Sequence, residues 1–374
     1  MEPMELELPR RGGEDQEQTD RAVFDRLTSV DLSDEEKALA VRPDQIAAQE
    51  TRLLAVHFHP EWVPLTLIED RLKTAFPAAQ DALVVPTQHN RVMTLGAWSG
   101  VEADVYAPAY GLKIQLLIHF PSSRLPKAGP FQAMMERTFR YRACQLLEIL
   151  EALVRPGETL AREIKKNGFS SQAVRLAASF AKRVEDLIRR ENVLEGPRSE
   201  MIKNRLLPDF MQARGQLIDA ALMDRALALV RLVKASVKRR LDSSRFHEAR
   251  EVIEEARSLG AGVVIPHPPQ FWPALLDDLD VDGWEVWNPS TPAHTLFLLE
   301  CLARGDGRRR RPLLAFMGDD THMSSKIRPD LSDDKPGVPR EIGFQPPWRD
   351  SAEALARAGQ SRERTMDEYR ARLA

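Results

Sequence analysis

The sequence predicts an α/β fold in which short buried strands alternate with helices and form a closed or distorted barrel. Seven apolar runs, most of them rich in Val, Ile or Leu, predict buried strands at 52–58, 82–87, 100–106, 113–119, 262–267, 283–288 and 312–317. Helical patterns fall between several of these runs, for instance at 65–75 and 246–258. This alternation favours a parallel sheet. Polar side chains follow the ends of several strands, which favours a barrel over an open sheet.

Composition and charge narrow the class of protein. The 374 residues suffice for one large domain with an insertion or for two domains, and 43% hydrophobic and 29% charged residues are ordinary for a globular chain. A net charge of −3 gives no electrostatic reason to bind bulk nucleic acid or an anionic membrane. Cys144 and Cys301 lack metal-type spacing, and the polar N-terminus lacks an apolar signal core. We therefore expect a cytoplasmic protein without a membrane span.

An N-terminal extension is expected over 1–45, before the first strand. Residues 1 to about 20 are rich in Glu, Arg and Gly, which predicts a disordered tail. A helix should begin at Ser33, because its hydroxyl can cap the first turn and Glu36 completes a capping box. The barrel is then expected over 46–128 and 250–350, and a C-terminal helix over 351–374.

The segment 129–249 interrupts the alternation of strands and helices. Its apolar residues recur at helical spacing, and the pairs Pro156-Gly157 and Gly196-Pro197 divide it into separate helical stretches. We interpret it as a helical insertion between barrel strands. Its length offers a docking surface for a protein partner.

Histidines and acidic residues gather where the predicted strands end. His57 and His59 follow the apolar run 53–56, and their i, i+2 spacing on an extended segment directs both imidazoles to one side. The other candidates stand in similar positions along further predicted strands: His89, Glu102, His267, Asp320 and His322. Imidazole and carboxylate groups gathered in this way predict a metal site.

Six motifs occur in order within 50–128 and 250–325. They are Val56-His-Phe-His59, Pro86-Thr-Gln-His-Asn90, Gly100-Val-Glu-Ala-Asp104, Gly262-Val-Val-Ile-Pro-His-Pro268, Asp282-Gly-Trp-Glu-Val-Trp-Asn288 and Gly318-Asp-Asp-Thr-His322. Their order and spacing resemble the PHP superfamily (polymerase and histidinol phosphatase), in the branch of small metal-dependent phosphoesterases that carries a helical insertion. The resemblance implies a distorted (β/α)7 TIM-like barrel that binds divalent metal at the C-terminal ends of its strands.

The resemblance also implies the metal ligands, for one to three Mn, Fe or Zn ions: His57, His59, His89, Glu102, His267, Asp320 and His322. Glu102 would bridge a first and a second metal, and His89 with His322 would serve a third. Ligands of these types suit such ions, and adjacent metals can activate a water and clamp a phosphoryl group. The implied function is hydrolysis of phosphoesters in a small phosphorylated metabolite or nucleotide.

Four residues near the last strand are candidates for catalysis. Asp320 and His322 belong to the final motif, and Lys326 and Arg328 follow it, where they could reach a substrate phosphate or remain solvated loop charges. Glu285 lies on a predicted strand and is expected to pack in the barrel wall.

Departures from the family pattern keep other functions open. Gln88 stands where an aspartate is usual, Pro64 where an acidic residue is expected, and Gln115 where a histidine is expected. Glu61 and His119 lie near the last two positions and could substitute for the missing ligands. One alternative is hydrolysis of a C–N bond by the same metal chemistry. Another is a degenerate barrel that binds a ligand or partner without catalysis.

Overall fold

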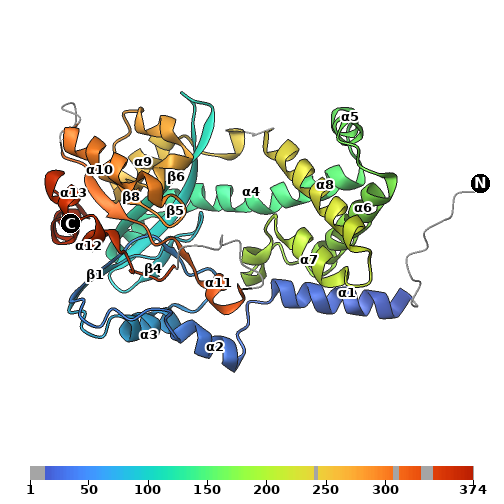
Figure 1. The fold of residues 1–374 in the computed structure, drawn as a ribbon, viewed down its shortest axis with the longest axis horizontal. Coiled ribbons are helices and arrows are strands. Elements are labelled where there is room, and N and C mark those ends of the chain that lie inside the picture. The colour runs from blue at the N-terminus through green and yellow to red at the C-terminus, as the bar shows by residue number, and fades with distance from the viewer. Residues whose placement is uncertain (1–12, 240–242, 306–310, 330–339, 374) are drawn as a thin grey trace, which may run out of the picture. The chain divides into compact units, whose positions relative to one another are not determined.

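The computed structural model describes residues 13–239, 243–305, 311–329 and 340–373 (Figure 1). The chain divides into two compact units. The first comprises Met1–Asp31 and Arg140–Leu241, and the second comprises Leu32–Phe139 and Asp242–Ala374. The predicted strands and candidate metal ligands belong to the second unit. The predicted mixture of helices and strands is confirmed, with 55% helix and 15% strand.

The described strands of the second unit form three sheets. The largest has the order β4 (Met93–Leu95), β5 (Trp98–Ala107), β6 (Leu112–Pro121), β7 (Gly262–Ile265), β8 (Gly283–Trp287) and β9 (Leu314–Met317). The other two pair β1 (Arg52–Ala55) with β3 (Asp81–Val84), and β2 (Phe58–His59) with β10 (Thr321–His322). Each predicted strand overlaps an observed one, whereas β4 and β10 were not predicted. No closed ladder of strands is found among the described residues.

The prediction of a parallel sheet is wrong for its first half. Strands β4 to β7 pair antiparallel, and only β7, β8 and β9 pair parallel within this sheet. Residues 108–111 alone join β5 to β6, with Gly111 at a φ of 63°. A connection this short makes a hairpin, because a parallel crossover needs a dozen or more residues. The hairpin reverses β6 relative to β5, and β7 pairs antiparallel with β6 as well.

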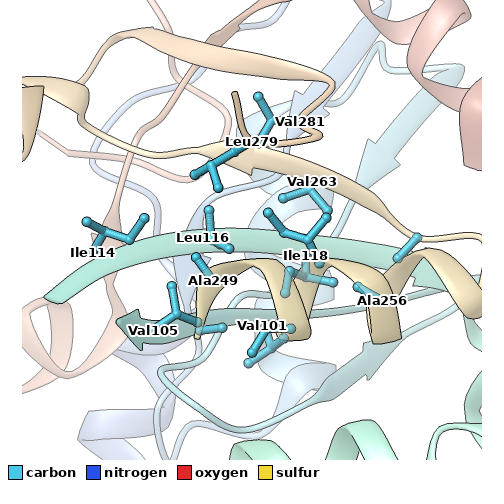
Figure 2. Packing of buried hydrophobic residues seen from close by; sticks show 14 of the residues in the cluster. Val101, Val105, Ile114, Leu116, Ile118, Ala249, Ala256, Val263, Leu279 and Val281 are labelled. Carbon is cyan, nitrogen blue, oxygen red and sulfur yellow. The ribbon is translucent and has the colours of Figure 1, made fainter. Parts of the chain in front are cut away.

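The main core of the second unit lies where helix α9 (Ala249–Ser258) packs with β5, β6 and β7 (Figure 2). Val101 and Val105 alternate along β5, and Ile114, Leu116 and Ile118 do so along β6, so that each strand buries one face here. Burial of each such side chain contributes about 1.5–3 kcal/mol. This packing fixes β5 and β7, the strands that carry or precede two candidate ligands.

The helices of the second unit agree in part with those predicted from the sequence. The predicted cap of α2 (Asp34–Val41) is confirmed, since Ser33 and Glu36 form a capping box, and α3 (Leu65–Ala75) has the predicted bounds. The single helix predicted over 351–374 is wrong, because Gly359 at a φ of 63° separates two helices. The remaining helices are α10 (Thr295–Arg304), α11 (Met323–Ile327), α12 (Pro347–Asp350), α13 (Ala352–Arg357) and α14 (Arg362–Leu373).

The first unit is built from helices. They are α1 (Gly13–Thr28), most of α4 (Gly129–Val154), α5 (Glu158–Lys166), α6 (Ser171–Arg190), α7 (Leu206–Arg214) and α8 (Ala220–Arg239). The disordered tail predicted to about residue 20 is wrong from Gly13 onward, and residues 1–12 lie outside the described residues. Helix α1 is held because Phe24 is buried and Asp20 pairs with Arg183 and Arg214. None of the described helices combines the length and apolarity needed to cross a membrane.

Candidate metal centre

His57 and His59 lie at the junction of β1 and β2, inside the second unit. Both side chains are fully buried, and their ring centroids are 5.3 Å apart. Their Nε2 atoms lie 3.5 and 3.3 Å from the same oxygen, Oδ1 of Asp320. The two imidazoles therefore converge on one carboxylate, as their spacing predicts.

Glu102 on β5 stands between four histidines. Its Oε1 lies 3.7 Å from His57 Nε2 and 3.4 Å from His267 Nε2. Its Oε2 lies 3.6 Å from His59 Nε2 and 2.6 Å from His89 Nδ1. A carboxylate with histidines at both oxygens has the arrangement that a bridging ligand requires.

His322 completes the cluster on the other side of His59. The His59 ring stacks between the rings of His89 and His322, with centroids 4.4 and 4.2 Å away. His322 Nε2 lies 3.5 Å from Asp320 Oδ1. The seven residues predicted as ligands are thus brought into one cluster by segments that lie far apart in the sequence.

Several atoms of the cluster have no hydrogen-bond partner among the described residues. They are buried, and they include His57 Nε2 and both ring nitrogens of His59; the Glu102 oxygens have histidines as ion-pair neighbours but no hydrogen bond of good geometry. An unsatisfied buried polar group costs about 1–3 kcal/mol, so a cation bound among these atoms would remove a large unfavourable contribution. Potential ligand atoms within 4.8 Å of one another occur in two overlapping groups, one of His57, His59 and Glu102 and one of His59, His89 and His322. These residues fit a divalent cation.

Electrostatics keep the carboxylates of the cluster ionised. Burial works against the charge of Glu102, but His89 and His267 hold its pKa well below the ordinary value. Burial likewise opposes the charge of Asp320, and His57 and His322 keep its pKa low. Burial, together with the charges of His322 and His89, lowers the pKa of His59 to about 3, which leaves a neutral imidazole able to coordinate.

Glu285 orients His57, which corrects the expectation that it packs in the barrel wall. Its Oε1 lies 2.5 Å from His57 Nδ1, and its Oε2 accepts a hydrogen bond of 2.8 Å from the backbone of His267. The contact at Nδ1 turns His57 Nε2 toward the cluster, as carboxylates commonly do for metal-binding histidines. Gly318 makes room for this, because a Cβ there would lie 1.9 Å from Glu285 Oε1.

Backbone strain concentrates at the same place. The described residues include five that have positive φ and are not glycine, and four of them belong to or adjoin the cluster: Glu61, Asn90, His267 and Asp320. Such conformations are costly for residues with a Cβ and gather at functional sites. His267 at 29° and Asp320 at 49° are themselves candidate ligands. The strained backbone conformations therefore occur at the residues that orient the candidate ligands.

Lys326 and Arg328, for which a substrate phosphate or solvent was expected, are each paired with an acidic residue. Lys326 Nζ lies 2.5 Å from Asp44 Oδ2, and Arg328 Nε lies 2.6 Å from Glu36 Oε1. Both ion pairs connect α11 and the residue after it to the N-terminal segment of the second unit. The cation beside the cluster is Arg340, whose Nη1 lies 2.8 Å from Asp320 Oδ2. No motif or spacing in the sequence indicates Arg340.

The two proposed substitutes for missing family ligands differ in outcome. Glu61 Oε1 lies 3.6 Å from His322 Nδ1, so this carboxylate does reach the cluster. Gln88 supports it, since its Oε1 accepts the Glu61 amide at 3.1 Å. His119 instead bonds to the Val56 carbonyl and to Tyr369, and it is satisfied as a structural residue.

Comparisons with known proteins give loose structural matches. No protein-family model and no curated protein matches the chain. One similar structure, from Bifidobacterium adolescentis, is described as a "putative metal-dependent phosphoesterase"; it has 17% identity and a TM-score of 0.40 over 84% of this chain and 97% of that one. Another is an amidohydrolase from Chromobacterium violaceum, with 15% identity and a TM-score of 0.38 over 82% and 97%. The family resemblance seen in the six motifs stays a prediction, and the chemical argument rests on this chain's own residues.

Proposed function

We propose that this protein is a divalent-metal-dependent hydrolase of phosphoesters in small phosphorylated molecules. The observation that carries the proposal is the buried cluster in which His57, His59 and Glu102 direct atoms without hydrogen-bond partners at one another. A buried site of this composition is poorly stable without a cation and well suited to one.

Each residue of the cluster has a defined part in the proposal. His57, His59 and Asp320 would hold one cation, and Glu102 would share it with a second position that His267 faces. His89 and His322 would provide a further position, with Glu61 beside it. When bound, a divalent cation supplies Lewis-acid activation of water and of the phosphoryl group. Glu285 holds His57 in the tautomer that presents Nε2 to the cluster.

A phosphoester is preferred to a C–N bond because of the charge beside the cluster. Transfer of a phosphoryl group builds negative charge on its oxygens, and a preorganised cation nearby stabilises it. Arg340 is itself paired with Asp320 Oδ2, and it would supply this charge from the edge of the cluster. The presence of Glu61 at His322 also offsets the absence of an acidic residue at position 64, which weakens the case for a degenerate site.

We also infer that the three sheets of the second unit act as one distorted barrel. Single backbone hydrogen bonds connect the sheets at places where the strands are not paired along their length. Glu102 donates its amide to Gln88 at 3.1 Å, which joins β5 to the segment after β3, and Asp320 donates to His57 at 2.9 Å, which joins the segment after β9 to the end of β1. If these two hydrogen bonds are counted with the strand pairings, the strands would follow one another around a ring. The residues of the cluster lie next to both hydrogen bonds.

The test is metal content and turnover of protein purified without chelator. We expect at least one equivalent of Mn, Fe or Zn, absent from the His57→Ala/His59→Ala variant, and hydrolysis of phosphoesters that chelator stops and added cation restores. The matched control removes His247 and His294, two histidines outside the cluster, and should retain the cation. Cation-dependent cleavage of amides alone would favour the C–N alternative. No bound cation after reconstitution would contradict a metal centre.

A further inference from the structure

Arg340 contacts Asp320 at two places. Its Nη1 lies 2.8 Å from Asp320 Oδ2 and also donates a hydrogen bond of 2.5 Å to the Asp320 carbonyl oxygen. Its Nη2 donates to Ser290 Oγ at 2.7 Å. The guanidinium is largely buried, at 12% exposed, and so is held in place on a carboxylate of nearly equal exposure, 13%.

These contacts divide the two oxygens of Asp320 between different partners. Oδ1 faces the Nε2 atoms of three histidines at 3.3–3.5 Å: His57, His59 and His322. Oδ2 faces Arg340. A carboxylate whose second oxygen is held by a guanidinium can offer only the first to a cation, whereas an unrestrained carboxylate can rotate or chelate through both.

The backbone of Asp320 also depends on fixed contacts. Its φ of 49° lies in the left-handed region, which residues with a Cβ adopt uncommonly, although Asp does so more readily than most. The Asp320 amide donates to His57, and its carbonyl accepts from Arg340, so both sides of the strained residue are tied. The hydrogen bond from the Asp320 amide to the His57 carbonyl holds Asp320 near the histidine pair. The contact with Arg340 orients the Asp320 carboxylate.

We propose that Arg340 is a positioning residue that restricts Asp320 to coordination through Oδ1 alone. The inference rests on the proposed metal centre and concerns the geometry of one ligand in it. Since Arg340 acts through Asp320, its removal should change how the cation is bound even where the fold is unaffected. Supporting residues of this kind typically change metal affinity by about 10–100-fold.

The experiment uses Co²⁺ as the probe, with affinity and the visible absorption spectrum of the full chain as readouts. Arg340→Met should weaken Co²⁺ binding by about tenfold or more and change the spectrum, because a carboxylate that is free to chelate raises the coordination number. Arg340→Lys, which restores a charge near Oδ2, should recover part of the affinity. Ser290→Ala removes only the Nη2 contact and should shift both readouts less, in the same direction. If Arg340→Met does not fold, the Ser290→Ala variant still tests the proposal.

Arg362→Met is the matched control. Arg362 is equally buried at 14% exposed, and like Arg340 it bonds one carboxylate, Glu50, and one backbone carbonyl, that of Arg52. It should leave Co²⁺ affinity and spectrum unchanged. The proposal is overturned if Arg340→Met binds Co²⁺ like the control, or loses affinity with an unchanged spectrum. Wild-type protein that binds no Co²⁺ would instead contradict the metal centre itself.

Discussion

His119 is a buried histidine whose hydrogen bonds require a neutral ring. Its Nε2 lies 2.9 Å from the Val56 carbonyl and its Nδ1 lies 2.7 Å from the Tyr369 hydroxyl. Because a carbonyl can only accept, Nε2 carries the proton and Nδ1 accepts from the hydroxyl. Burial, reinforced by the charge of His57, lowers the pKa of His119 to about 3, because the hydrogen bond to Val56 offsets it only in part.

This pKa predicts that acid weakens the fold through His119. The unfolded histidine titrates near 6.5 and the folded one near 3, so between these values the unfolded state binds one more proton. The contribution to stability is complete above the unfolded pKa and falls by about 1.4 kcal/mol per pH unit below it. His119→Gln keeps one donor and one acceptor, and should remove this slope. Urea unfolding of both proteins between pH 7 and pH 4.5 measures the difference, and parallel pH profiles would contradict it.

The candidate ligands could be predicted from the sequence because each follows an apolar run, and strand ends meet in a folded sheet. The residues that orient them could not. Glu285 is within a strand pattern that also fits wall packing, and its role depends on the space left by Gly318. Arg340 reaches Asp320 through the tertiary fold alone, while Lys326 and Arg328, which are nearer in sequence, find acidic partners elsewhere.

At the scale of elements, a buried ion pair connects three segments of the second unit. Arg71 on α3 forms a two-pronged contact with Glu341, at 2.7 and 2.6 Å, and both side chains are 1% exposed. Its Nη1 also donates to the carbonyls of Leu39, Ala40 and Arg42 at the end of α2. Glu341 immediately follows Arg340, so the pair anchors the backbone from which Arg340 extends.

Removing one partner of this pair should destabilise the protein strongly. Arg71→Met would leave the Glu341 carboxylate buried without its counter-charge, at a cost of about 3–5 kcal/mol in the free energy of unfolding. Arg71→Met with Glu341→Met should recover part of that loss, because no isolated charge then remains. The control is Arg304→Met, which breaks an exposed pair with Glu300 and should cost about 0–1 kcal/mol. Urea unfolding of the wild type and the three variants gives these differences; equal losses for Arg71→Met and Arg304→Met would contradict the argument.

The elements themselves were predictable to different degrees. Helix α3 and the cap of α2 follow from local patterns, which residues near in sequence determine. The direction of β6 does not follow from its apolar run, because a buried strand has the same pattern in either direction; the short connection at 108–111 decides it. Likewise, Gly359 at positive φ separates α13 from α14. The residues on both sides have a helical pattern, so the sequence predicts one continuous helix there.

At the scale of the whole molecule, the cluster depends on the folded second unit. Its ligands come from the β1–β2 junction, the segment after β3, β5, the segment after β7, and the segment from the end of β9 into β10. The first and last of them, His57 and His322, are far apart in sequence, and the fold places both beside Asp320 Oδ1. A cation that binds this cluster therefore binds the native state and has little affinity for the unfolded chain.

Such a cation should stabilise the second unit by linkage. At a free Mn²⁺ concentration of 100 times Kd, the gain is about 2.7 kcal/mol, which corresponds to about 100-fold slower exchange of amides that open by unfolding of this unit. Hydrogen exchange should show the slowing at the Asp320 amide, bonded to His57, and at the Glu102 amide, bonded to Gln88. Helix α6 provides no ligand and should exchange at its original rate. In the His57→Ala/His59→Ala variant, Mn²⁺ should slow neither amide. Equal slowing there would mean that the ion acts at some other site.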